Sequence, residues 1–131
     1  MAGVKCLLDT HALLWWLADD DRLGPAPRAL IADPATEALV SVVSLWEITV
    51  KQRVGKLAAD IPALLRATEA AFPLLPIRPA HLRRLAALPA HHRDPFDHLL
   101  IAQAQAERAR FITADARAAL YPVTVLGCGS G

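Results

Sequence analysis

A chain of 131 residues that is 54% hydrophobic has enough apolar side chains to fold around a core, so a disordered protein is not expected. The length favours a single domain spanning residues 1–131. The net charge of +1 gives no sign of a strongly basic nucleic-acid-binding protein, and no apolar run approaches the roughly 18 residues that a membrane span needs.

Short apolar runs alternate along the chain with segments bounded by prolines and helix-capping residues. The first run, Val4 to Leu8, is continuous, as in a parallel strand buried on both faces. The expected strands are residues 4–8, 38–42, 74–77, 111–113 and 123–126. The expected helices are residues 11–18, 27–32, 44–54, 61–71, 80–87, 96–108 and 115–120. This alternation predicts a three-layer α/β/α fold with a mainly parallel central sheet.

Two of the expected helices have clear start signals. Ser44 is followed three residues later by Glu47, the spacing of a capping box in which each residue satisfies a backbone N–H at the helix start. Asp94 precedes Pro95, a proline suited to the first helical position. The helix after Pro95 is apolar over much of its surface, so we expect it to be central.

Four acidic residues stand where the chain would normally be buried. Asp9 ends the first apolar run, Glu47 lies inside another, Asp97 precedes a third, and Asp115 follows the predicted strand 111–113. Burying a lone carboxylate costs several kcal/mol unless it is paired or bound to a metal. These placements together predict one shared site for a divalent cation.

Parallel folds offer a place where such acids can meet. Ligands of these folds gather where the carboxyl ends of strands and the N-termini of helices share one face. Because the donors are all oxygen atoms, Mg²⁺ is the expected ion, with Mn²⁺ as a substitute. If four of the 13 acidic residues hold a metal, the 14 basic residues outnumber the remaining acids. The surface around the acidic site would then be mildly positive. That arrangement suits a phosphate-bearing substrate.

Each acid also has a purely structural interpretation, which the sequence leaves open. Glu47 could serve only the capping box, or pair with Lys51 four residues later. Asp94 and Asp115 could be helix caps, and Asp97 could interact favourably with the positive end of the helix dipole. Asp9 is the hardest to explain structurally, because it follows a largely apolar strand.

At these residues the chain resembles a PIN-domain protein, specifically a VapC-type toxin of a type II toxin–antitoxin system. The resemblance covers nearly the whole chain and rests on the order and spacing of four segments together. They are Leu7-Leu8-Asp9-Thr10-His11, residues 44–51 with Gly55-Lys56-Leu57, residues 93–104, and Thr113-Ala114-Asp115.

The resemblance implies a Mg²⁺-dependent endoribonuclease that cleaves RNA phosphodiester bonds with a metal-activated water. Asp9 and Asp97 match the direct metal ligands, and Glu47 and Asp115 complete the acidic catalytic site. Asp94 matches an accessory acid of this subgroup. The resemblance also implies a homodimer and a cognate VapB-like antitoxin that covers the active site and represses the shared operon.

Several other residues are candidates for assisting the site. Thr10 and Thr113 could hydrogen-bond carboxylates or water, and His11 is close enough in sequence to Asp9 to reach the site. His91, His92 and His98 lack a paired ligand spacing, so we expect them to be structural or exposed. Lys51, Arg53 and Lys56 form either a solvated helix face or a patch that steers phosphate.

The two cysteines, Cys6 and Cys128, make neither a zinc motif nor a disulfide framework. Polar residues interrupt the first apolar run, so it is not a signal peptide, and a reducing cytoplasm is the expected location.

Two other functions remain as alternatives. One is a catalytically silent binding module that keeps the PIN fold. The other is a phosphatase with a strand-end aspartate nucleophile, which is a poor match because the second aspartate such enzymes need is replaced by His11. The sequence does not identify the RNA target.

Overall fold

The computed structural model describes residues 4–91 and 94–131, so the candidate His92 lies outside the described residues. The strands are β1 (Lys5–Leu8), β2 (Glu37–Ser41), β3 (Leu74–Leu75), β4 (Arg110–Thr113) and β5 (Val125–Gly127). The helices are α1 (Thr10–Leu17), α2 (Pro25–Ala32), α3 (Val42–Arg53), α4 (Ile61–Ala71), α5 (Pro79–Ala87) and α6 (Pro95–Glu107), with the short 3₁₀ helix η1 (Ala116–Leu120).

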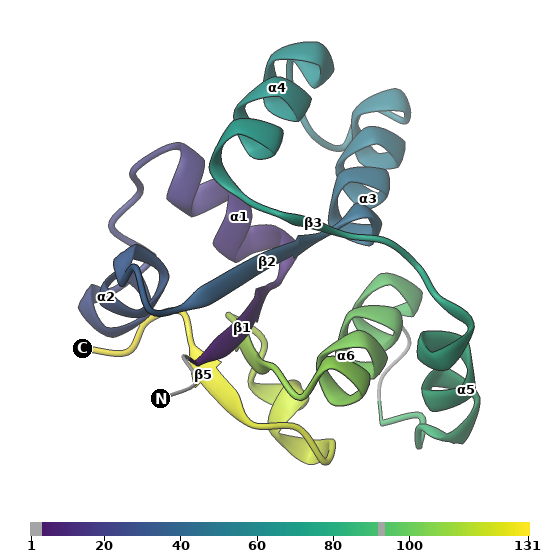
Figure 1. Ribbon diagram of the computed structural model, residues 1–131. Helices are drawn as coiled ribbons and strands as arrows, with labels where there is room; N and C mark the ends of the chain where they lie inside the picture. The colour runs from purple at the N-terminus through teal and green to yellow at the C-terminus, as the bar shows by residue number, and fades with distance from the viewer. Residues whose placement is uncertain (1–3, 92–93) are drawn as a thin grey trace.

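The strands form one sheet in the order β3-β2-β1-β4-β5 (Figure 1). All of its neighbouring strands pair in parallel, and Leu7 in the central strand lies opposite Leu39 on one side and Phe111 on the other. The predicted α/β fold with a mainly parallel sheet is therefore confirmed.

Alternate side chains of β1 enter two different hydrophobic clusters. Cys6 and Leu8 pack with residues of α1, α2 and α4, whereas Leu7 packs with residues of α6 and η1. This alternation follows from the two-residue period of a strand, whose successive side chains point to opposite faces. Figure 1 shows α1, α2 and α4 on one side of the sheet and α5 and α6 on the other.

Helix α3 belongs to both clusters. Val43 packs in the cluster beneath α6, while Leu45 and Ile48 pack in the cluster beneath α1. The helix thus lies across the end of the sheet and joins the two layers.

The start of α3 differs from the prediction. The helix begins at Val42, and Ser41 caps it by accepting a hydrogen bond from the Val43 N–H at 3.0 Å. Ser44 and Glu47 therefore lie inside the helix, and the predicted capping box is wrong. Strand β2 runs directly into α3 without a loop, so the cap falls on the last strand residue.

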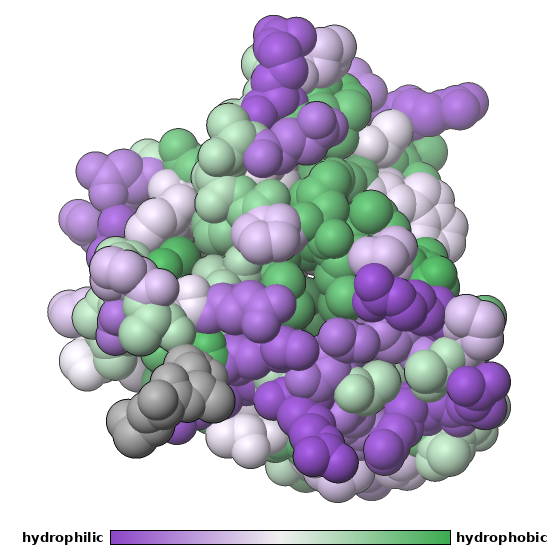
Figure 2. Space-filling model, in the orientation of Figure 1, coloured by the Kyte–Doolittle hydropathy of each residue, from purple (hydrophilic) through white to green (hydrophobic). Residues whose placement is uncertain are grey.

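The surface is uneven in polarity. In Figure 2 hydrophobic residues gather where α3, α4 and β3 meet, and hydrophilic residues cover the region of α5 and α6. Among the residues that the structure describes, no helix has both the length and the apolar character to cross a membrane.

Candidate active site

Asp9 lies at the carboxyl end of β1 and is the N-cap of α1. Its Oδ1 accepts from the Ala12 N–H at 2.7 Å, and its Oδ2 accepts from the Ala114 N–H at 3.3 Å. Burial raises the pKa of Asp9 above its ordinary value, and the hydrogen bonds from the backbone and from Thr113 oppose that rise. Asp9 therefore joins the end of β1 to the turn after β4, and its capping role coexists with its place in the acidic site.

Glu47 lies deeper in α3 than a first-turn position. Its side chain is only 4% exposed. The Thr10 hydroxyl donates to its Oε1 at 2.6 Å, and the Lys51 ammonium pairs with its Oε2. Because Thr10 directly follows Asp9, this bond holds Glu47 against the same corner of the fold.

Asp97 lies in the first turn of α6, as predicted. Asp94 is the N-cap of that helix, and its Oδ1 accepts from the Phe96 N–H at 2.9 Å and the Asp97 N–H at 3.2 Å. The pKa of Asp97 is raised to about 7, first by burial and then by the nearby acids Asp94, Asp9, Glu47 and Asp115. The structure thus brings the four predicted acids, and Asp94, into one electrostatic neighbourhood.

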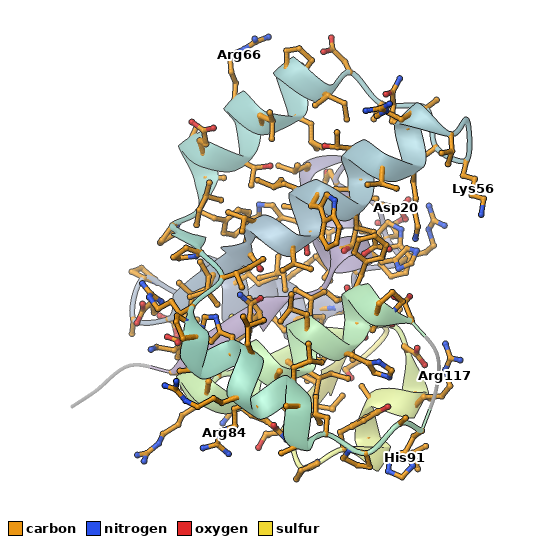
Figure 3. The ribbon with its side chains drawn as sticks, turned by 90° about the vertical axis from the view of Figure 1, so that its right-hand side faces the viewer. Asp20, Lys56, Arg66, Arg84, His91 and Arg117 are labelled. Atoms are coloured by element: carbon orange, nitrogen blue, oxygen red, sulfur yellow. The ribbon has the colours of Figure 1, made fainter. Side chains whose placement is uncertain are left out.

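Asp115 lies at the rim of this neighbourhood. It is the N-cap of η1, and its two carboxylate oxygens accept from the Arg117 guanidinium at 2.8–3.2 Å. The Thr113 hydroxyl in turn accepts from the Asp115 N–H at 3.0 Å. Figure 3 shows Arg117 extending to the edge of the molecule, so this pair is a partly solvated boundary of the site.

The donor set suits a hard cation bound largely through water. No three His, Cys, Asp or Glu side chains of the described residues are arranged to enclose an ion. Mg²⁺ in proteins is commonly held by one or two carboxylates and keeps several waters, so it does not require a full protein cage. The all-oxygen donors fit such an ion, as does the raised pKa of Asp97, which comes first from burial and then from the neighbouring acids.

Lys51 is not simply part of a solvated helix face. Its ammonium pairs with the buried Glu47, as one of the interpretations of Glu47 from sequence predicts. Its pKa is raised first by that hydrogen bond, with Asp94 and Asp97 adding to the effect. The i,i+4 spacing of Glu47 and Lys51 is the sequence signal for this pair. Arg117 is not among the residues predicted from sequence, because its pairing with Asp115 depends on the local turn.

Three of the described histidines, His11, His91 and His98, contact aromatic side chains. His11 is exposed, its ring centroid is 5.6 Å from that of Trp15, and its charge lowers the pKa of Asp9. His98 Nε2 lies 3.1 Å from the Tyr121 hydroxyl, which also accepts from the His91 N–H at 2.9 Å. These contacts fit the structural role expected for His91 and His98.

Comparison with known proteins gives consistent results. The PIN domain model matches residues 6–123. The chain is 31% identical over 126 residues to Ribonuclease VapC22 of Mycobacterium tuberculosis (strain ATCC 25618 / H37Rv), covering 91% of this chain and 96% of that protein.

Solved structures share the fold at lower identity. The VapBC2 complex of Rickettsia felis, bound to a DNA fragment from its promoter, superposes with a TM-score of 0.75 at 14% identity, covering 95% of this chain and 98% of that chain. DNA-bound VapBC from Salmonella typhimurium gives a TM-score of 0.70 at 13% identity, covering 95% and 98%.

Proposed function

The chain belongs to the PIN domain family, and we propose that it is a Mg²⁺-dependent endoribonuclease that acts as the toxin of a type II toxin–antitoxin system. The observation that carries the proposal is the placement of Asp9, Glu47, Asp97 and Asp115 where strands end and helices begin at one end of the parallel sheet. A relative that is 31% identical over nearly its full length is a ribonuclease by name, which supports RNA as the substrate.

Asp9 and Asp97 are the proposed metal ligands, because they lie at a strand end and a helix N-terminus on the same face. Bound Mg²⁺ supplies an activated water and neutralises charge on the phosphodiester. The Thr10 hydroxyl and the Lys51 ammonium fix the Glu47 carboxylate, so that Glu47 can orient a water without swinging away. Lys51 and Arg117 place positive charge at the edges of the acidic site, where phosphate oxygens of RNA would approach.

We also propose a cognate antitoxin as the protein partner. The structural neighbours include a toxin–antitoxin complex from Klebsiella pneumoniae with a TM-score of 0.66 at 20% identity. A cell that makes an RNA-cleaving enzyme needs such an inhibitor. A homodimer is proposed from the family resemblance.

The direct test is cleavage of purified RNA with and without Mg²⁺. We expect Asp9→Asn and Asp97→Asn each to reduce the rate by at least a hundredfold, while both proteins stay folded. Glu69→Gln, which changes an exposed acid on α4, is the matched control and should cleave like the wild type. Equal cleavage by the wild type and both asparagine variants would remove the proposed function.

A further inference from the structure

A mostly apolar cavity of about 480 Å³ opens beside the acidic site. Thr113 and Asp115 line it, so it shares a wall with the candidate active site. The same turn also holds Asp9, because the Ala114 N–H donates to Asp9 Oδ2. A molecule in this cavity would therefore lie next to whatever the acids bind.

Two of the residues that line the cavity carry planar groups, the Trp15 ring and the Arg22 guanidinium. The Arg22 guanidinium carbon lies 4.9 Å from the centre of the Trp15 ring. Asp20 fixes that guanidinium with hydrogen bonds at 2.7–3.2 Å. The guanidinium plane is thus held over the Trp15 ring before any ligand arrives.

Other lining residues have small or apolar side chains. They include Ala116 and Ala119 of η1 and Val125 of β5. The volume lies in the ~300–1,000 Å³ range of small-molecule pockets.

We infer that this cavity, the Trp15 pocket, receives one unstacked base of the RNA strand, next to the phosphodiester bound at the acids. The inference rests on the proposed function. Bases displaced from a strand stack on aromatic rings and on arginine planes, and the cavity is lined by one of each, Trp15 and Arg22. An apolar lining with few polar groups accommodates the face of any base, and the acidic wall lies where the backbone phosphate meets a cation.

The test uses substrate oligonucleotides that carry a single abasic site at each position around the cut. In the wild type, the abasic site at one flanking position should lower kcat/KM by roughly 5- to 100-fold, the range that loss of one base–aromatic stack gives, mainly through KM. Trp15→Leu should lower kcat/KM on the intact oligonucleotide by a similar factor and should lose the sensitivity to that abasic site. Trp16→Leu is the matched control, because its ring packs on Phe72 instead.

A second variant tests the pocket without changing Trp15, in case Trp15→Leu does not fold. Ala119→Phe fills the cavity from an exposed position of η1, and Ala86→Phe makes the same change on α5, away from the cavity. The inference is overturned if Ala119→Phe keeps both the wild-type rate and the abasic sensitivity, or if no flanking abasic site matters in the wild type. Asp97→Asn, measured in parallel, distinguishes failure of the pocket inference from failure of the proposed function. If Asp97→Asn abolishes cleavage but the pocket variants do not change it, only the pocket inference is rejected. If cleavage survives Asp97→Asn, the proposed function is rejected as well.

Discussion

The ammonium of Lys51 pairs with the Glu47 carboxylate one turn earlier on α3, and it lies within the electrostatic influence of Asp94 and Asp97. Lys51 is therefore a tethered cation in the neighbourhood where we propose that a metal binds. It neutralises part of the acidic charge when no metal is present.

Replacing Lys51 should strengthen metal binding while it weakens the metal-free fold. In Lys51→Gln, a positive charge that repels the cation is gone and Glu47 is released, so we expect the Kd for Mn²⁺ to fall roughly tenfold. Calorimetric titration with Mn²⁺ measures this. Arg53→Gln removes the same charge from an exposed position on α3 and is the control. Equal affinities for the two variants would show that Lys51 does not compete with the metal.

The raised pKa of Asp97 makes metal-free stability depend on pH. A carboxyl whose folded pKa of about 7 exceeds its unfolded value of 3.8 stabilises the fold fully below 3.8, and this contribution is lost as pH rises through 7. Asp97→Asn should therefore raise the melting temperature at pH 8 in EDTA, by about 3–8 °C for about 1–2 kcal/mol after allowance for solvent screening. The gain should shrink towards pH 4, and a variant that is less stable than the wild type at pH 8 would count against the clustered acids.

Metal binding should displace protons near neutral pH. Asp97 must be ionised to bind a cation, so the affinity for Mg²⁺ should fall as pH drops below about 7. Calorimetry at pH 7 in buffers of different ionisation enthalpy should show about half a proton released per Mg²⁺ bound. Asp97→Asn should release fewer protons than the wild type. Proton release that is equal in the wild type and the variant would assign the titration to another group.

The bond from Thr10 to Glu47 should matter for both stability and catalysis. Thr10→Val keeps the side-chain shape but leaves a buried carboxylate oxygen without its donor, at a cost of about 1–3 kcal/mol. We also expect a loss of cleavage, because Glu47 is no longer held from two sides. Thr10→Ser keeps the hydroxyl, so it should retain most of the stability and most of the cleavage rate. Denaturant unfolding measures the first and cleavage kinetics the second.

A second polar cluster, far from the acids, should affect stability alone. His81 is fully buried between α5 and α6, its Nδ1 accepts from the Arg78 N–H at 3.0 Å, and its Nε2 lies 3.0 Å from Glu107. The hydrogen bond with His81 is the main cause that lowers the pKa of Glu107, so the stabilising contribution is present above pH 4.5 and is lost as pH falls below it. Glu107→Gln should reduce the melting temperature at pH 7 more than at pH 3.5 and leave cleavage unchanged.

Local signals in the sequence predicted most of the fold. The range of α4 was predicted correctly, because Asp60 and Pro62 mark its start. The start of α3 was misplaced, because Ser41 and Ser44 are both suitable caps and only the end of β2 decides between them. The predicted strand 74–77 is only Leu74–Leu75, where the sheet edge gives few partners.

The grouping of the four acids could be predicted from the sequence, but the contacts that hold them could not. The parallel topology brings strand ends and helix starts together, so the four acids could be grouped from sequence. The bond from Thr10 to Glu47 spans 37 positions and depends on how α1 packs against α3, which no local pattern encodes. The contact between Trp15 and Arg22 depends in the same way on the path of the loop between α1 and α2.

The position of α3 across both hydrophobic clusters has a consequence for folding. Because Val43 is anchored in one layer and Ile48 in the other, neither layer can open without releasing the helix that carries Glu47. The helix therefore acts as a cooperative link, and we expect both halves to unfold in a single step. A partly folded chain is therefore not expected to support the proposed cleavage of RNA, so residual cleavage should track the fraction of fully native molecules.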